Sequence, residues 1–183
     1  GHDRTHLEIL ERAGGPVLAI DTPKNLDEIE AEIMDATLVI DALFGVGLVR
    51  PVEGHFADIV HAMLLAPRTL AVDIPSGLAT DTGRVLGASV IAERTVTMAA
   101  LKVALVSAPG FARCGELEIA DIGVPPQLIA ASTVHAGLIE RSDVVRWLPR
   151  PHVLDHKGRR GHVLVVGGYP GMRGAGRLAA ISA

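Results

Sequence analysis

Aromatic residues and cysteine are both scarce in this chain. Aromatic side chains make up 3% of the residues although hydrophobic residues make up 49%, so the core must be built mainly from Val, Leu, Ile and Ala. Cys114 is the single cysteine and cannot form an internal disulfide. A chain without internal disulfides fits a reducing compartment, and we expect a cytoplasmic protein in which Cys114 behaves as a small hydrophobic residue near a turn.

Long apolar runs and an excess of basic charge are lacking as well. No apolar stretch approaches the roughly 18 residues that a membrane-spanning helix needs, because Asp, Arg or Lys interrupts every candidate. The net charge is −4 with acids and bases mixed, which disfavours nucleic-acid binding. The first residues are polar and lack both Met and a secretory signal, and residues 177–183 look like the middle of a helix. We therefore expect a soluble piece of a longer chain.

Short apolar runs alternate with helical patterns through the first half of the sequence. This alternation is typical of βαβ units, so the expected fold class is α/β with a Rossmann-like parallel sheet. Asn25 is expected to cap a helix with Glu28 three residues later, and residues 56–64 repeat apolar side chains at helical spacing. Strands are predicted at residues 17–20, 37–42, 68–73, 94–98, 103–106 and 116–120, the last as an exposed or edge strand.

The strand and helix pattern stops in the middle of the chain. Residues 124–150 contain no clean strand, and the Pro-Arg-Pro at residues 149–151 is stiff and extended. We place a domain boundary in this stretch, with domains at residues 1–135 and 136–183. A strand at residues 162–168, a Gly-rich turn and an Ala-rich helix then predict the start of another α/β domain.

Two predicted strands end in an aspartate. Asp41 follows one apolar run, Asp73 follows the next, and Ser76 stands three residues after Asp73 in a turn fixed by Pro75. In an open parallel sheet, ligands bind in the crevice at the carboxyl ends of the strands, so these side chains are expected around one crevice. Carboxylate and hydroxyl oxygens suit a hard cation. The alternative is that the two aspartates cap the helices that follow them.

A glycine-containing turn comes directly after Asp41. Gly45 and Gly47 would let backbone N–H groups approach an anion, and Arg50 could pair with a phosphate, although many such turns contain glycine for steric reasons alone. Lys102 also follows a strand-like run, where we favour a solvated surface lysine over one that reaches the crevice. No His or Cys spacing predicts a zinc site.

These motifs resemble a known family. Residues 41–50, 72–77 and 120–125 resemble the second half of the NAD(P)H-hydrate epimerase domain. Residues 156–158, 161–168 and 171–175 resemble the opening of the ADP/ATP-dependent NAD(P)H-hydrate dehydratase, a ribokinase-like α/β domain. In this order the motifs are similar to those of the bifunctional enzymes that repair nicotinamide nucleotides damaged by hydration.

The resemblance implies an activity and a set of site residues. An epimerase would interconvert the S and R forms of hydrated NADH or NADPH, and a dehydratase would restore the S form with ADP or ATP. Potassium would be held by Asp41, by Ser76 and by an Asn of an upstream loop that these residues do not include. Ala175 is similar to a substrate-contacting position of the dehydratase. The hydrated dinucleotide would contact Asp73 and the turn formed by Gly45, Val46, Gly47, Leu48, Val49, Arg50 and Pro51, where Val46 replaces the Thr common in the family.

Asp73 is our candidate for the catalytic acid/base of the epimerisation, with a pKa tuned toward neutrality in a partly closed crevice. A homo-oligomer is expected. One alternative is a binding module similar to the epimerase-like scaffolds of messenger-RNA decapping, which would not need the dehydratase-like residues 157–175. Another is the start of a ribokinase-like kinase for a sugar or vitamin, which would not need the epimerase-like half.

Overall fold

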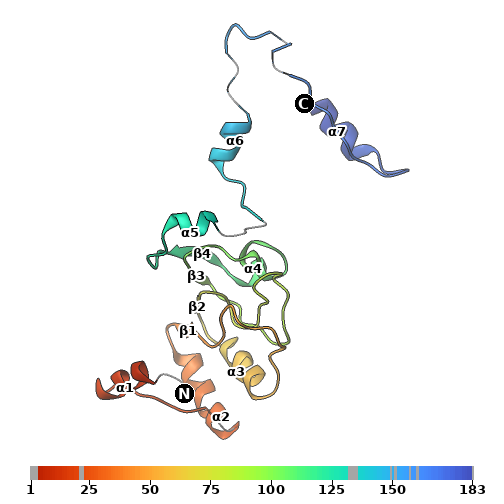
Figure 1. The fold of residues 1–183 in the computed structure, drawn as a ribbon. Helices are drawn as coiled ribbons and strands as arrows, with labels where there is room; N and C mark the ends of the chain where they lie inside the picture. The colour runs from red at the N-terminus through yellow and green to blue at the C-terminus, as the bar shows by residue number, and fades with distance from the viewer. Residues whose placement is uncertain are drawn as a thin grey trace. The chain divides into compact units, whose positions relative to one another are not determined.

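Four parallel strands form a single sheet in the order β1 (Val39–Asp41), β2 (Thr69–Val72), β3 (Arg94–Met98) and β4 (Glu116–Ala120). Asp41 pairs with Ala71, and Val72 pairs with Val96, so the strands end at the same edge (Figure 1). The α/β class with a Rossmann-like parallel sheet is therefore confirmed. The register places the turns after β1 and β2 beside each other at the carboxyl edge of the sheet.

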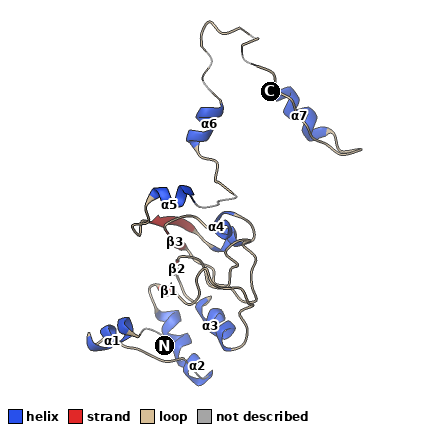
Figure 2. Cartoon of the chain, viewed as in Figure 1, coloured by secondary structure: helices blue, strands red, loops and turns tan. Residues whose placement is uncertain are grey.

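The computed structural model describes residues 4–20, 23–131, 136–148, 150, 152–156, 158–159 and 161–182. The chain divides into two units, residues 1–135 and 136–183. The first unit holds the sheet, and the described part of the second holds only helices, turns and extended segments (Figure 2). Among the described residues, no helix combines the length and the apolar character needed to cross a membrane.

The helices of the described residues are short. Those of the first unit are α1 (Thr5–Arg12), α2 (Pro23–Asp35), α3 (His55–Met63), α4 (Val103–Val106), the 3₁₀ helix η1 (Gly110–Arg113) and α5 (Pro126–Ala131). Those of the second unit are α6 (Arg141–Trp147) and α7 (Gly174–Ser182).

One face of the sheet carries the core. Thr69, Ala71, Thr95 and Thr97 alternate along β2 and β3 and are buried. Two apolar clusters are buried in this unit, one containing Val52, Val60, Met63 and Val90, the other containing Ile74, Leu78, Ala104, Leu105 and Cys114. Cys114 is fully buried at the end of η1, as expected, and burial raises the pKa of its thiol to about 11.

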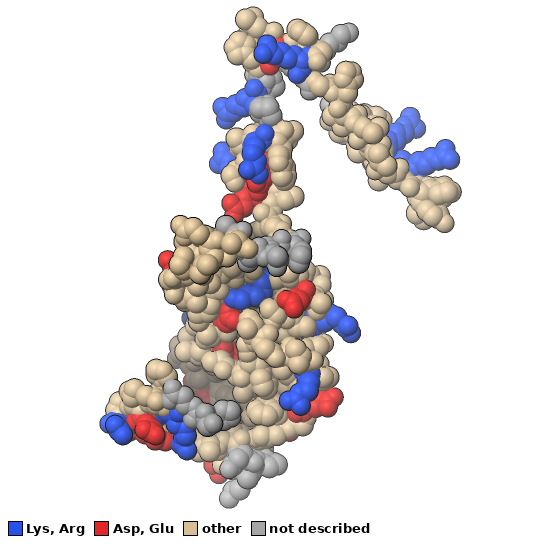
Figure 3. Space-filling model, in the orientation of Figure 1, with Lys and Arg blue, Asp and Glu red and all other residues tan. Residues whose placement is uncertain are grey.

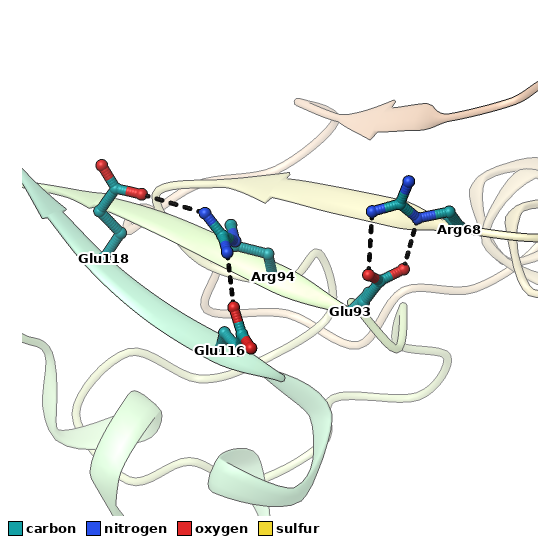
Figure 4. A network of polar contacts seen from close by, with 5 residues as sticks. All are labelled: Arg68, Glu93, Arg94, Glu116 and Glu118. Carbon is teal, nitrogen blue, oxygen red and sulfur yellow. Dashed lines mark hydrogen bonds and ion pairs between the residues drawn. The ribbon is translucent and has the colours of Figure 1, made fainter.

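Exposed ion pairs lie near the starts of β2, β3 and β4, at the edge of the sheet opposite to the carboxyl ends of the strands. Arg94 bridges Glu116 and Glu118, and Arg68 makes a two-bonded pair with Glu93 (Figure 4). Acidic and basic side chains are interspersed on the visible face of the first unit instead of forming a patch of one sign (Figure 3). Such exposed pairs contribute little to the free energy of folding.

Three predicted strands are wrong. Residues 17–20 form no strand and are held instead by side chains, with Asn25 Nδ2 donating to Ala19 O at 3.0 Å and His55 Nε2 lying 2.6 Å from Ile20 O. Residues 103–106 form α4, because an apolar run of four residues does not distinguish a buried strand from a buried helical turn. Residues 162–168 form no strand, since the described part of the second unit offers none for pairing.

Several element boundaries differ from the prediction by a few residues. The helix expected after Asn25 begins at Pro23, where the fixed φ of proline suits the first helical turn. The strands predicted at residues 94–98 and 116–120 match β3 and β4 to the residue, and β4 is an edge strand as expected. The predicted Ala-rich helix near the end of the chain is α7.

Candidate functional site

The turns after β1 and β2 are joined by Asp41 and Ser76. The Ser76 hydroxyl donates to Asp41 Oδ1 at 2.6 Å, and the Ser76 backbone N–H donates to Asp41 Oδ2 at 2.7 Å. Leu43 N–H also donates to Asp41 Oδ1 at 3.3 Å. Asp41 is 0% exposed and Ser76 is 1% exposed. Asp41 is therefore buried, and in the part of the chain that the structure describes its hydrogen bonds all come from neutral donors.

The Asp41–Ser76 pair presents oxygen atoms of the kind that a potassium ion binds. Phe44 N–H donates to Ser76 Oγ at 2.9 Å, and Phe44 O lies 3.3 Å from the same oxygen. A carboxylate, a hydroxyl and a carbonyl thus lie together, and hard oxygen donors suit a hard cation. Among the described residues no group of three or more His, Cys, Asp and Glu could hold a metal ion.

Asp73 forms a second cluster at the same edge of the sheet. Lys102 Nζ donates to Asp73 Oδ1 at 2.5 Å, and Met98 N–H donates to the same oxygen at 3.0 Å. Thr97 Oγ1 lies 3.3 Å from it. The side chains of Lys102 and Asp73 are 16% and 18% exposed, so solvent reaches the pair. The expectation that Lys102 is a solvated surface residue is wrong.

The pKa of Asp73 lies below its ordinary value. Burial alone would raise this pKa, but the hydrogen bonds from Lys102, Met98 and Thr97 and the charge of Lys102 together outweigh burial. Asp73 is therefore a carboxylate at neutral pH, and the expected shift toward neutrality is wrong. The reason is the ammonium group of Lys102, which lies 29 positions after Asp73 in the chain and which the sequence analysis expected at the surface.

Two residues in the turn from Asp73 to Gly77 have backbone conformations that few residue types adopt. Asp73 has a φ of +71°, in the left-handed region that Asp tolerates better than most residues. Gly77 has a φ of +95°, and a Cβ there would lie 2.0 Å from Ala88 O. The left-handed backbone at Asp73 and the close approach at Gly77 therefore restrict which residues can stand at these two positions.

The turn at residues 45–51 leaves open space around its glycines. A Cβ at Gly45 or Gly47 would meet no atom within 4 Å, and neither residue has a positive φ. The fold therefore does not require glycine at these two positions for steric reasons. Leu48 N–H donates to Gly45 O at 3.3 Å, which closes the turn and leaves the glycine backbone accessible.

Two cavities border this turn. One of about 350 Å³ is lined by Phe44, Leu48, Arg50, Pro51, Val52, Glu53 and Phe56. The Phe44 and Phe56 rings meet edge to face in it, with centroids 5.2 Å apart. The other, of about 280 Å³, lies between the turn and residues 79–86, where Thr80 Oγ1 donates to Val46 O at 3.1 Å. Because the backbone of Phe44 binds Ser76 while its ring lines the first cavity, the Asp41–Ser76 pair and the turn are coupled.

The structure brings together some of the predicted residues and separates others. Asp41 and Ser76 are hydrogen-bonded, whereas the Asp73 carboxylate is bound by Thr97, Met98 and Lys102 instead of by that pair. Ala175 lies in α7 of the second unit and is exposed. Lys102 is the residue that sequence reasoning misjudged. Its position four residues after the end of β3, on the same edge as Asp73, is the signal that could have indicated its role.

Comparison with known proteins identifies similar chains. The chain is 41% identical over 184 aligned positions to the bifunctional NAD(P)H-hydrate repair enzyme of Moorella thermoacetica, covering 100% of this chain and 35% of that protein. It is 36% identical to the enzyme of the same name from Salinibacter ruber over 191 positions, with the same coverage of each chain. It is 46% identical over 97 residues to the NAD(P)H-hydrate epimerase of Levilactobacillus brevis, covering 52% of this chain and 45% of that protein.

The chain thus spans about a third of the length of these bifunctional relatives. The family described as YjeF-related protein N-terminus matches residues 1–104, more than half of the chain, and the chain belongs to this family.

Proposed function

We propose that the first unit epimerises hydrated NADH and NADPH in the repair of nicotinamide nucleotides. The observation that carries this proposal is Asp73. It is an ionised and solvent-accessible carboxylate at the carboxyl edge of the sheet, in the same turn as Ser76 of the Asp41–Ser76 pair. The name of the Levilactobacillus brevis relative, NAD(P)H-hydrate epimerase, supports the same activity.

The chemistry needs a group that moves one proton. A hydrated nicotinamide ring carries a hydroxyl on a carbon next to the ring nitrogen. Loss of this hydroxyl as water takes up one proton and leaves an iminium, and addition of water to the other face of the ring releases one proton. A proton from solvent would leave with the hydroxyl as water. The Asp73 carboxylate would accept the proton that the incoming water releases and pass it back to solvent, so no proton is gained or lost overall.

The turn at residues 45–51 is proposed to bind the dinucleotide. Its glycine backbone is open to an approaching anion, and Arg50 lines the larger cavity beside it. Backbone N–H groups and a guanidinium are suitable donors for a pyrophosphate. The edge-to-face Phe44 and Phe56 rings offer an apolar surface in the same cavity.

A potassium ion is proposed at Asp41, Ser76 and the carbonyl of Phe44. Their oxygens lie within 3.3 Å of Ser76 Oγ, and they have the donor chemistry that this ion requires. When bound, potassium would supply positive charge to this edge of the sheet. Asp41 and Ser76 would hold the ion and, through the Phe44 backbone, fix the start of the binding turn.

The second unit is proposed to belong to a dehydratase that uses ADP or ATP, with Ala175 near its substrate. This proposal rests on the resemblance of residues 156–175 and on the two bifunctional relatives that match 100% of this chain. A cytoplasmic location and a homo-oligomer remain predictions.

The test of the epimerase proposal is the variant Asp73→Asn. It keeps the size of the side chain and removes the proton acceptor, so the rate of S/R interconversion should fall about a hundredfold or more, as is usual for a general base. The rate would be measured by chiral separation of the epimers of hydrated NADH, in the longest native form of the protein that contains these residues.

The matched control is Asp35→Asn, which changes an exposed carboxylate at the end of α2. It should leave the rate unchanged. An Asp73→Asn protein that interconverts the epimers as fast as the unmodified protein would rule out Asp73 as the base.

A further inference from the structure

We propose that Lys102 is a positioning residue, which fixes the Asp73 carboxylate in the orientation and charge state that proton transfer needs. The inference rests on the proposed function, because it assigns a role in the same reaction.

The ammonium group of Lys102 donates hydrogen bonds to three acceptors of the protein. Its Nζ donates to Asp73 Oδ1 at 2.5 Å, to Met98 O at 2.8 Å and to Thr97 Oγ1 at 2.9 Å. A lysine ammonium has three N–H donors, and all three are directed at these acceptors. Lys102 therefore has no donor left for a substrate, which argues for a role through Asp73 and against direct contact with the reacting atoms.

The two oxygens of Asp73 are in different environments. Oδ1 accepts hydrogen bonds from Lys102 Nζ and Met98 N–H, and Thr97 Oγ1 lies 3.3 Å from it. Among the described residues no hydrogen bond reaches Oδ2. One oxygen is thus anchored by three groups while the other is left for a proton, and the 18% exposure of the side chain gives solvent or substrate access to it.

The loop after β3 is shaped to bring Lys102 back to the strand end. Ala99 has a φ of +62°, in the left-handed region, and Ala100 N–H donates to Met98 O at 2.7 Å. This tight turn reverses the chain, so that Lys102 reaches a carbonyl four residues before it. A half-buried ammonium is unfavourable unless it is paired, and here the pairing comes from the end of β3 and from Asp73.

Lys102 is the charged group in contact with Asp73 among the described residues. Asp41, the other carboxylate at this edge, is bound by Ser76 and Leu43. Thr97 and Met98, which complete the cluster, carry no charge. A change in the titration of Asp73 can therefore be assigned to Lys102.

The experiment compares Lys102→Met with Lys102→Arg. For each variant, kcat and KM of epimer interconversion are measured against pH, and the Asp73 carboxyl is titrated by carbon-13 NMR. Lys102→Met should lower kcat by up to about a hundredfold, as expected for a misplaced catalytic group, with little change in KM. It should also raise the pKa of Asp73, and the acid limb of the pH profile should move up with it, because the cation that lowers this pKa has gone.

Lys102→Arg separates charge from geometry. A planar guanidinium keeps the positive charge but cannot direct its donors to the same three acceptors, so the pKa of Asp73 should stay low while kcat still falls. This variant also keeps the proposal testable if Lys102→Met does not fold. The matched control is Arg68→Met, which breaks an ion pair at the opposite edge and should change neither quantity.

The outcomes distinguish the two proposals. An upward shift of the Asp73 titration in Lys102→Met, in a protein that does not interconvert the epimers, would support the positioning contact and contradict the proposed reaction. Folded Lys102→Met and Lys102→Arg proteins with unchanged kcat and unchanged Asp73 titration would overturn the positioning role and leave the epimerase proposal standing.

Discussion

Asp41 and Asp73 each stand where a parallel strand ends, yet the structure gives their side chains different environments. Asp41 is buried, and its partners are a hydroxyl and two backbone N–H groups. Asp73 is partly exposed, and its strongest partner is the ammonium of Lys102. One carboxylate is enclosed by neutral donors, while the other faces solvent beside a cation.

This difference separates two tasks at one edge of the sheet. An enclosed carboxyl group whose hydrogen-bond partners are neutral connects two turns, and its oxygens have the chemistry that suits a hard cation. An accessible carboxylate with one anchored oxygen can exchange protons with a ligand. Strand position alone therefore does not determine the role of a strand-end aspartate, since the loops that follow the strands supply the partners.

Removal of the Asp41 carboxylate should produce the largest loss of stability in this comparison. Asp41→Ala leaves the N–H groups of Ser76 and Leu43 buried without an acceptor, and we expect a loss of about 3 kcal/mol in the free energy of unfolding. Asp73→Ala should cost less, about 1 kcal/mol, because solvent reaches the Asp73–Lys102 pair and Lys102 keeps its bonds to Met98 and Thr97. Urea denaturation followed by circular dichroism measures both values.

The same variants test the potassium proposal. If Asp41 holds the ion, the unmodified protein should melt at a higher temperature in potassium than in sodium, and Asp41→Ala should lose this difference whereas Asp73→Ala keeps it. Equal losses of stability in the two variants would contradict the contrast between the enclosed and the accessible carboxylate.

The sequence predicted the parallel sheet and the edge at which the candidate site lies. β3 and β4 were predicted to the residue, and the alternation of residues 116–120 correctly indicated an exposed or edge strand. The meeting of Asp41 with Ser76, 35 residues later, follows from the rule that parallel strands end at one edge. Such rules act on whole elements, and they need no knowledge of individual side chains.

The side-chain environment of the site could not be predicted in the same way. The pairing of Lys102 with Asp73 depends on a left-handed turn at Ala99 and on α4, which a four-residue apolar run cannot distinguish from a strand. The strands expected at residues 17–20 and 162–168 lack paired neighbours among the described residues. Tertiary context decides both cases, and a single sequence carries little information about it.

Acid should weaken the Asp73–Lys102 pair in a defined direction. Because the pKa of Asp73 is lower in the folded protein than its ordinary value, its contribution to stability is complete above about pH 4 and is lost as the pH falls through the folded pKa. We expect the difference in unfolding free energy between the unmodified protein and Lys102→Met to shrink by up to about 1 kcal/mol over this range. Urea denaturation at a series of acidic pH values measures it.

Other carboxylates titrate in the same range, so the comparison uses the difference between two proteins that share them. Asp73→Asn in both backgrounds completes a double-mutant cycle, and the pH dependence of the difference should then disappear. A difference that persists without the Asp73 carboxylate would mean that Lys102 stabilises the protein through Met98 and Thr97 alone.

The smallest effect is expected at the exposed pair of Arg68 and Glu93, which provides a reference for the other two. The hydrogen bond and charge of Arg68 lower the pKa of Glu93, yet both side chains are more than half exposed. Solvent screens such a pair, and its loss is offset by the freedom that the long side chains regain. Arg68→Met should therefore leave the urea midpoint within experimental error at low and at high salt. A salt-dependent loss of stability in this variant as large as that of Lys102→Met would show that the charge of Lys102, and not its placement at the strand end, accounts for its effect on stability.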